Sequence, residues 1–218
     1  ADTIVELAES LAAAAPACAI EPSWRAAFGC AYQNSFETAR AVCAVNALLG
    51  CWGQKGGALI TSSPKPGDVD PVKFPKVPEP AAKRVGDEEY PLALSGTGTN
   101  LAVLNGCNDG TVQGVFFYNS NAAKGYAQPK VWSEAFEKLD LVVSIDVQMS
   151  ETAMQADYVL PECTYLERME APDYIGGKKQ FVALRAQVID RLHPETKPCD
   201  EIFAGLAQAC GVGQYFDF

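Results

Sequence analysis

The segment from Leu141 to Glu167 constrains the fold of this 218-residue chain more than any other part. Leu141 to Ile145 is an apolar, β-branched run that stops abruptly at Asp146, as a fully buried parallel strand does at the edge of a sheet. Asp157 to Leu160 forms a second such run, and Pro161 stops it. Because ligands of open parallel sheets bind beyond the carboxyl ends of the strands, the polar residues between the two runs are the first candidates for function.

Helices and further strands alternate along the rest of the chain. Apolar residues at helical spacing predict helices over Thr3 to Ala15, about Phe36 to Leu49 with Ser35 as the cap, near Asn100 to Asn108, and over Lys130 to Leu139. Additional strands are predicted at Pro16 to Ile20 and at Val112 to Tyr118. This order predicts an α/β fold in which all four strands lie in one mainly parallel sheet flanked by helices.

Residues 61–94 interrupt the alternation. They hold seven prolines among scattered charges, namely Pro64, Pro66, Pro71, Pro75, Pro78, Pro80 and Pro91. A segment this rich in proline predicts an irregular excursion, because proline removes the backbone N–H that helices and sheets need. With 48% hydrophobic residues, the chain can bury a substantial core, and we expect one domain over residues 1–218 with residues 61–94 as an irregular insertion.

Charge and hydropathy exclude some classes of partner. The chain has 17 Lys and Arg against 27 Asp and Glu, a net charge of −10, which argues against a nucleic-acid-binding surface. No apolar run approaches the roughly 20 residues of a membrane helix, so we expect no direct membrane insertion. The first residues have an amphipathic pattern, and we expect no signal segment in them.

Cysteine and histidine provide no recognisable metal site. The eight cysteines include no Cys-x-x-Cys pair, the local arrangement that iron–sulfur and zinc sites normally use. Most lie in Ala- or Leu-rich contexts and are expected to be buried thiols, with a distant disulfide as the alternative. The single histidine, His193, precedes Pro194 in a polar loop with no partner at ligand spacing. We therefore predict no bound metal.

Two glycine-rich turns have open interpretations. Gly96 to Asn100 begins like a dinucleotide-binding fingerprint, but Leu101 replaces the third glycine, which favours a turn with a threonine helix cap. Gly53, Gly56 and Gly57 follow the predicted second helix. They are either helix-terminating turns or positions where a bulky cofactor approaches the backbone, and the sequence alone does not distinguish these.

The segment described first resembles the molybdopterin-dependent oxidoreductases of the dimethyl sulfoxide reductase family. Their catalytic subunits carry the pattern D-x-x-x-[TS]-E-T-A-x-x-A-D-x-V-L-P and then a glutamate. This chain matches it with Asp146, Ser150-Glu151-Thr152-Ala153, Ala156-Asp157, Val159-Leu160-Pro161 and Glu167. Residues 161–168, PECTYLER, are most similar to the thiosulfate and polysulfide reductase branch. Three further blocks, at residues 40–57, 115–123 and 178–211, resemble the family in the expected order.

The resemblance implies a Rossmann-like dinucleotide-binding variant of the α/β fold. It also implies that the chain is a fragment, the central domain of a catalytic subunit, which binds part of a bis-molybdopterin guanine dinucleotide cofactor. The cysteine-rich iron–sulfur segment, the metal-ligating residue and the C-terminal domain of full-length members have no counterpart here. The chain alone is therefore expected to be inactive and to bind no metal.

For the parent enzyme, the resemblance implies reduction of a sulfur oxyanion or polysulfide in anaerobic respiration. The implied partners are the remaining domains of the catalytic subunit, an iron–sulfur electron-transfer subunit and a membrane subunit. Export to the outer face of the cytoplasmic membrane is the location that the family implies. The alternative function is a standalone nucleotide-binding or interaction module without redox activity, because a fold alone does not fix a function.

Four polar residues at strand ends are the leading cofactor-binding candidates. Asp146 can accept N–H bonds from a guanine edge or bond a ribose hydroxyl, although a carboxylate can also simply cap a strand end. Asn119 and Asn121 can bond a sugar, phosphate or base, or act only as turn formers. If the strands are neighbours, these residues and Ser144 converge on one crevice. Ala122 departs from the family, which usually has proline there.

Other residues receive secondary assignments. Ser150, Gly56, Gly57 and Gln180 complete the predicted cofactor-binding set. Glu151 and Thr152 are expected to fix their loop by capping the short helix. Glu167 and Arg168 are expected to form an ion pair that holds the segment after Pro161.

Overall fold

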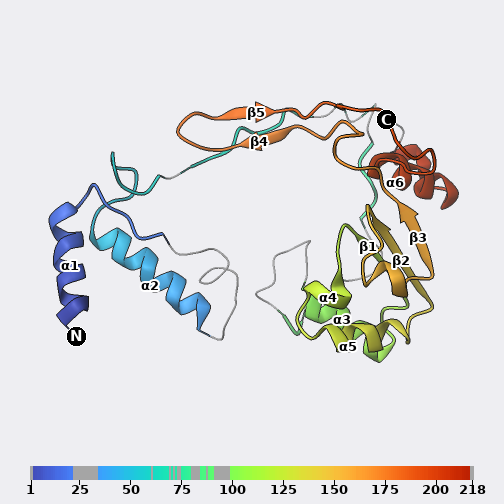
Figure 1. Cartoon of the computed structure of the whole chain (residues 1–218), viewed down its shortest axis with the longest axis horizontal. Helices are drawn as coiled ribbons and strands as arrows, with labels where there is room; N and C mark the ends of the chain where they lie inside the picture. The colour runs from blue at the N-terminus through green and yellow to red at the C-terminus, as the bar shows by residue number, and fades with distance from the viewer. Residues whose placement is uncertain are drawn as a thin grey trace. The chain divides into compact units, whose positions relative to one another are not determined.

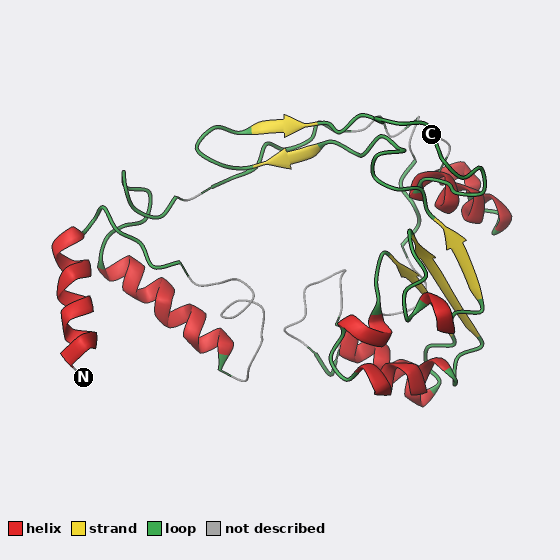
Figure 2. Ribbon diagram, viewed as in Figure 1, coloured by secondary structure: helices red, strands yellow, loops and turns green. Residues whose placement is uncertain are grey.

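The computed structural model describes residues 2–21, 34–59, 61–68, 70, 72, 75–79, 84–86, 88–90 and 99–216. Their contacts form two compact units, a first unit of Ala1–Pro66 with Pro172–Ala183 and a second unit of Gly67–Ala171 with Leu184–Phe218. One domain over residues 1–218 stays a prediction. Helices and strands are both present in the described residues (Figure 2). No helix in this part of the chain is long and apolar enough to span a membrane.

The second unit contains a parallel sheet. Strands β1 (Gly114–Tyr118), β2 (Leu141–Asp146) and β3 (Tyr158–Pro161) lie in the order β1-β2-β3 (Figure 1). Both pairings are parallel, so the carboxyl ends of all three strands reach the same edge. In the central strand β2, five of six residues are buried, which explains its unbroken apolar run. The parallel α/β prediction is confirmed for these three strands.

Helices cover one face of this sheet, and a further helix contacts the other. On one face, α3 (Asn100–Asp109), α4 (Ala122–Gly125) and α5 (Pro129–Phe136) pack with the core residues Leu104, Cys107, Phe117, Ala122, Trp132, Ala135, Phe136 and Val142. On the other face, Phe203 of α6 (Cys199–Ala209) contacts the Tyr118 ring edge-on at 5.7 Å. Short 3-10 helices, η2 (Ala153–Gln155) and η3 (Gly213–Tyr215), complete the unit. Thr99 accepts the N–H of Ala102 at 3.1 Å, which confirms the threonine cap of α3.

The described residues of the first unit form two helices and a hairpin. These are α1 (Asp2–Ala14), α2 (Ser35–Leu48), and the antiparallel strands β4 (Asp173–Ile175) and β5 (Phe181–Ala183) (Figure 1). The predicted cap of α2 is wrong by one residue. Asn34 is the cap, and Ser35 is the buried first residue of the helix. In the described residues between 61 and 90, the backbone forms no helix or strand.

The predicted strand at Pro16 to Ile20 is wrong. Residues 16–20 form a turn and an irregular segment in the first unit, while the sheet lies in the second unit. A side chain replaces the expected strand partner, because the Asn46 amide accepts from the Ile20 N–H at 2.9 Å and donates to its carbonyl at 2.8 Å. The backbone groups of Ile20 are thus satisfied without a strand partner, and Pro16 has no N–H to donate to one.

Candidate functional site

The loops that follow the three parallel strands begin at the same edge of the sheet. Asn119 continues β1, and its N–H donates to the Ile145 carbonyl at 2.9 Å. Its backbone φ of 48° lies in the left-handed region, which asparagine tolerates better than most residues. The Asn119 side chain is exposed. This residue is therefore held in one backbone conformation and presents its amide at the carboxyl edge.

Asp146 ends β2 and is 8% exposed. Its Oδ2 accepts from the Ser150 hydroxyl at 2.9 Å, and its Oδ1 accepts from the Gln148 N–H at 3.3 Å. The Ser150 hydroxyl also accepts the Ala153 N–H at 3.3 Å, so Ser150 caps the turn into η2. A carboxylate has about four acceptor positions, so two remain after these contacts. Asp146 thus organises the turn after β2 and retains capacity for a ligand.

Asn121 does not offer a free amide. Its Nδ2 donates to Glu151 Oε2 at 2.7 Å, and its Oδ1 accepts from the N–H and hydroxyl of Thr152 at 3.2 and 3.0 Å. The prediction that Glu151 and Thr152 act by capping the short helix is wrong, because Thr152, at the cap position of η2, makes no side-chain cap bond and Glu151 bonds to the loop after β1. Both residues instead bond to the loop after β1.

Ser144 lies inside the sheet and not at its edge. It is paired in register with Phe117 on one side and Val159 on the other, and it is fully buried. Its hydroxyl has no hydrogen-bond partner in the described part of the chain. Ser144 lies two residues before Asp146 on β2, so the edge residues are Asn119, Asn121 and Asp146, with Ser150 behind them.

Gly56, Gly57 and Gln180 lie in the first unit. Gly56 has a φ of +83°, and a Cβ on Gly57 would lie 2.2 Å from the Cys51 carbonyl oxygen, so both positions require glycine for structural reasons. The Gln180 amide donates to the Ser62 carbonyl and hydroxyl at 2.7 and 2.8 Å and so attaches the β4–β5 hairpin to residue 62. Their cofactor-binding role stays a prediction.

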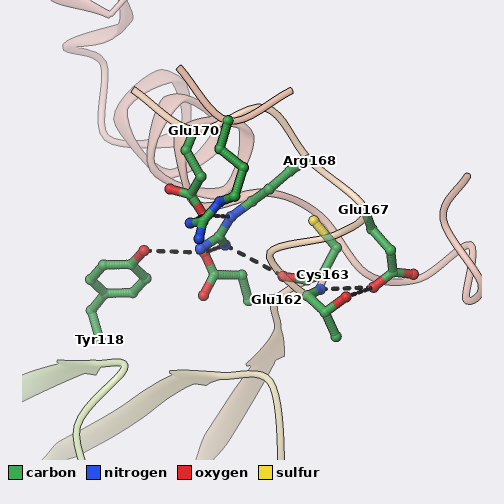
Figure 3. Close-up of polar contacts among 8 residues, drawn as sticks. Tyr118, Glu162, Cys163, Glu167, Arg168 and Glu170 are labelled. Carbon is green, nitrogen blue, oxygen red and sulfur yellow. Dashed lines mark hydrogen bonds and ion pairs between the residues drawn. The ribbon is translucent and has the colours of Figure 1, made fainter. Parts of the chain in front are cut away.

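A second polar group lies beyond Pro161 and is shown in Figure 3. Glu162, whose side chain is 1% exposed, pairs with Arg168 and accepts from the Tyr118 hydroxyl at 3.1 Å. Glu170 Oε1 bonds both Arg168 and Arg185 at 2.8 Å. We call these five residues the Arg168 ion-pair chain. It connects the end of β1 to the segment that follows β3.

Burial and neighbouring charges shift the pKa values of Arg168 and Tyr118 in the Arg168 ion-pair chain. Burial lowers the pKa of Arg168, but the carboxylates of Glu170 and Glu162 raise it by more, so the guanidinium stays charged. Burial raises the pKa of Tyr118, with further contributions from its contact with Cys199 and the charge of Glu162. Tyr118 therefore remains a neutral donor toward Glu162.

The predicted Glu167–Arg168 ion pair is wrong. Arg168 pairs with Glu162 and Glu170, whereas the Glu167 carboxylate accepts the Leu192 N–H at 2.6 Å and the N–H and hydroxyl of Thr164 at 2.8 and 2.7 Å. These bonds, first that from Leu192 and then those from Thr164, lower the pKa of Glu167 to about 2. Glu167 thus joins two loop segments through backbone contacts.

Stability of the second unit should fall in acid because of Glu167. Its folded pKa of about 2 lies below its ordinary value of 4.5, so its contribution is complete above the higher value and is lost as pH falls toward the lower one. Urea unfolding between about pH 6 and about pH 2 measures this, with Glu167→Gln as the comparison. An equal loss of stability in wild type and Glu167→Gln over that range would contradict the assignment.

Among the described residues, no group of three or more His, Cys, Asp or Glu could hold a metal ion. The described cysteines are free thiols, of which Cys51, Cys107 and Cys163 are buried and Cys210 is exposed. Burial raises the pKa of the Cys107 and Cys163 thiols, as expected for structural cysteines. Cys30 lies outside the described residues.

Sequence reasoning missed Tyr118 and Glu162. Both lie next to residues that were recognised, Asn119 and Pro161, but their contact spans 44 residues of sequence. The available signal was a carboxylate directly after a strand-ending proline, since a glutamate there can turn back toward the sheet edge. The contact of Glu151 and Thr152 with the Asn121 loop could also have been predicted, because both loops follow neighbouring parallel strands and so lie at the same sheet edge.

Together, fold and site define an α/β domain that presents amide and carboxylate side chains at the carboxyl edge of a parallel sheet, where open α/β folds bind their ligands. The chain belongs to the molybdopterin oxidoreductase family, whose model matches residues 30–192.

Several characterised proteins are similar to this chain. Thiosulfate reductase molybdopterin-containing subunit PhsA of Salmonella typhimurium is 30% identical over 99% of this chain and 30% of its own length. Arsenate respiratory reductase subunit ArrA of Shewanella sp. is 27% identical over 87% of this chain and 24% of its own length. Acetylene hydratase from Pelobacter acetylenicus has a similar solved structure, with a TM-score of 0.48 and 31% identity over 53% of this chain and 16% of that one. The chain thus spans under a third of these curated relatives.

Proposed function

We propose that this chain is the part of a molybdopterin oxidoreductase catalytic subunit that binds a guanine nucleotide end of a bis-molybdopterin guanine dinucleotide cofactor. The observation that carries the proposal is the Asp146 carboxylate, which is held at the carboxyl end of the central strand with acceptor positions to spare. A guanine edge offers neighbouring N–H donors that suit a carboxylate. The exposed Asn119 amide on the adjacent strand supplies a second contact.

The donor set fits such a cofactor. A carboxylate and an amide can bind a base edge or ribose hydroxyls, and the backbone that carries both is fixed by the sheet ladder. When bound, the cofactor supplies the redox chemistry, while the protein supplies binding and orientation. The residues of this chain hold the nucleotide end, and other parts of the subunit hold the metal. The chain alone is accordingly inactive.

For the parent enzyme, we propose a reductase that acts on a sulfur oxyanion or polysulfide. This is supported by the similarity of nearly the whole chain to the thiosulfate reductase subunit PhsA. The remaining domains of the subunit, an iron–sulfur subunit and a membrane subunit are its proposed partners, and the outer face of the cytoplasmic membrane is its proposed location.

Asp146→Asn in the complete catalytic subunit tests the nucleotide contact. The amide keeps an acceptor for Ser150 but loses the charge, so cofactor binding should weaken by about 1.5–3 kcal/mol. Guanine nucleotide and molybdenum content of the purified variant measure the loss, and thermal unfolding is followed alongside. Asp140→Ala, at an exposed aspartate directly before β2, is the control. Undiminished cofactor content together with lowered stability would make Asp146 a structural cap only.

A further inference from the structure

Two loops at the carboxyl edge are joined by a dense set of side-chain bonds. The Asn121 amide bonds Glu151 and Thr152, as described above. Lys124 Nζ pairs with Glu151 Oε1 at 2.6 Å, and the Thr152 hydroxyl accepts the Ala123 N–H at 3.0 Å. We call Asn121, Lys124, Glu151 and Thr152 the Asn121 clamp. It connects the loop after β1 to the loop after β2, some thirty residues apart in sequence.

Burial of Thr152 and hydrogen bonds among the other members hold this clamp together. Thr152 is fully buried, so removal of its hydroxyl would leave the groups that bond to it unsatisfied. Asn121 Oδ1 accepts two bonds, which uses both of its lone pairs. The hydrogen bonds from Lys124 and then Asn121 lower the pKa of Glu151 to about 2, so its carboxylate stays charged at neutral pH. The Thr152 hydroxyl, Asn121 Oδ1 and both carboxylate oxygens of Glu151 are thus bonded within the protein.

The clamp lies next to the two candidate ligand contacts. Asn119 is two residues before Asn121, and Asp146 is five residues before Glu151. The left-handed backbone of Asn119 is an uncommon conformation that persists only where its surroundings fix it. Its N–H is bonded to the Ile145 carbonyl on one side, and the clamp fixes the chain on the other. Asn119 is therefore held from both directions.

We propose that Asn121, Glu151 and Thr152 are positioning residues, which lock the two loops together and so fix the spacing of Asn119 and Asp146 for the nucleotide. The inference rests on the proposed function for the identity of the ligand. The locking itself rests only on contacts within the chain. Asn121 accordingly acts on the ligand through Asn119 and does not touch it.

Two substitutions of Thr152 in the complete protein test this. Thr152→Val keeps the shape and removes both hydroxyl bonds, whereas Thr152→Ser keeps the hydroxyl. The first readout is amide hydrogen exchange of residues 119–125 and 147–152 in cofactor-free protein. The second is the rate at which bound guanine nucleotide dissociates. We expect Thr152→Val to speed both by about tenfold or more, and Thr152→Ser to stay within about twofold of wild type.

Val142→Ala is the matched control, because it removes buried volume from the core on β2, the strand that precedes the Thr152 loop. It should lower thermal stability without selectively speeding exchange in the two loops. Unchanged loop exchange in Thr152→Val, or the same exchange and dissociation pattern in Val142→Ala, would overturn the positioning role. If loop exchange rises in Thr152→Val but wild type retains no guanine nucleotide, the locking is supported and the proposed ligand fails. The two claims are thereby separated.

Discussion

Replacing Arg168 with leucine is expected to destabilise the second unit by about 3–5 kcal/mol, because it leaves a buried carboxylate without its counter-charge. The Glu162 side chain is almost completely buried, and Arg168 is its only ion-pair partner in the described part of the chain. Glu162 Oε2 already has no hydrogen-bond partner there. After the substitution, only the Tyr118 hydroxyl would contact the carboxylate. Urea unfolding measures the loss in free energy of unfolding, and hydrogen exchange at β2 and β3 shows whether the sheet is affected.

Two comparison variants separate this effect from lost packing. Glu162→Gln combined with Arg168→Leu removes the orphaned charge as well, so it should recover much of the stability lost in Arg168→Leu. Lys76→Ala breaks the exposed Lys76–Glu79 pair and should change stability by less than about 1 kcal/mol. A double variant that is as unstable as Arg168→Leu would show that the guanidinium acts through its packing and not through its charge.

The sequence predicted the sheet of the second unit well for a physical reason. A central parallel strand is buried on both faces, so β2 shows an unbroken apolar run that few other elements produce. The run at Pro16 to Ile20 looked similar, but its partner is the Asn46 side chain, 26 residues away. No local pattern distinguishes backbone groups satisfied by a strand from those satisfied by one amide.

Three of the predicted site residues, Asn119, Asn121 and Asp146, lie at the expected sheet edge, but Ser144 lies inside the sheet and several side-chain partners differ from those predicted. Asn119 and Asp146 reach the same sheet edge because parallel strands share it, which strand prediction alone implies. Arg168 was paired with its neighbour Glu167, whereas the structure pairs it with Glu162 and Glu170. Proximity in sequence suggested an ion pair between Glu167 and Arg168. In the structure, the Glu167 carboxylate accepts from the backbone N–H groups of Thr164 and Leu192 instead. The choice between these partners depends on tertiary structure.

Trp132→Ala should also cost the second unit about 3–5 kcal/mol, because it opens a cavity in the core that supports β1. Trp132 is 2% exposed, and its ring lies edge-on to Phe117 at 6.2 Å and to Tyr126 at 5.4 Å. Phe117 directly precedes Tyr118 on β1, so this loss should weaken hydrogen-exchange protection in β1 and β2 together. Trp52→Ala in the first unit, where the ring is 39% exposed, is the control and should leave that protection unchanged. A loss below about 1 kcal/mol for Trp132→Ala would mean that the core collapses around the missing ring and that β1 does not depend on it.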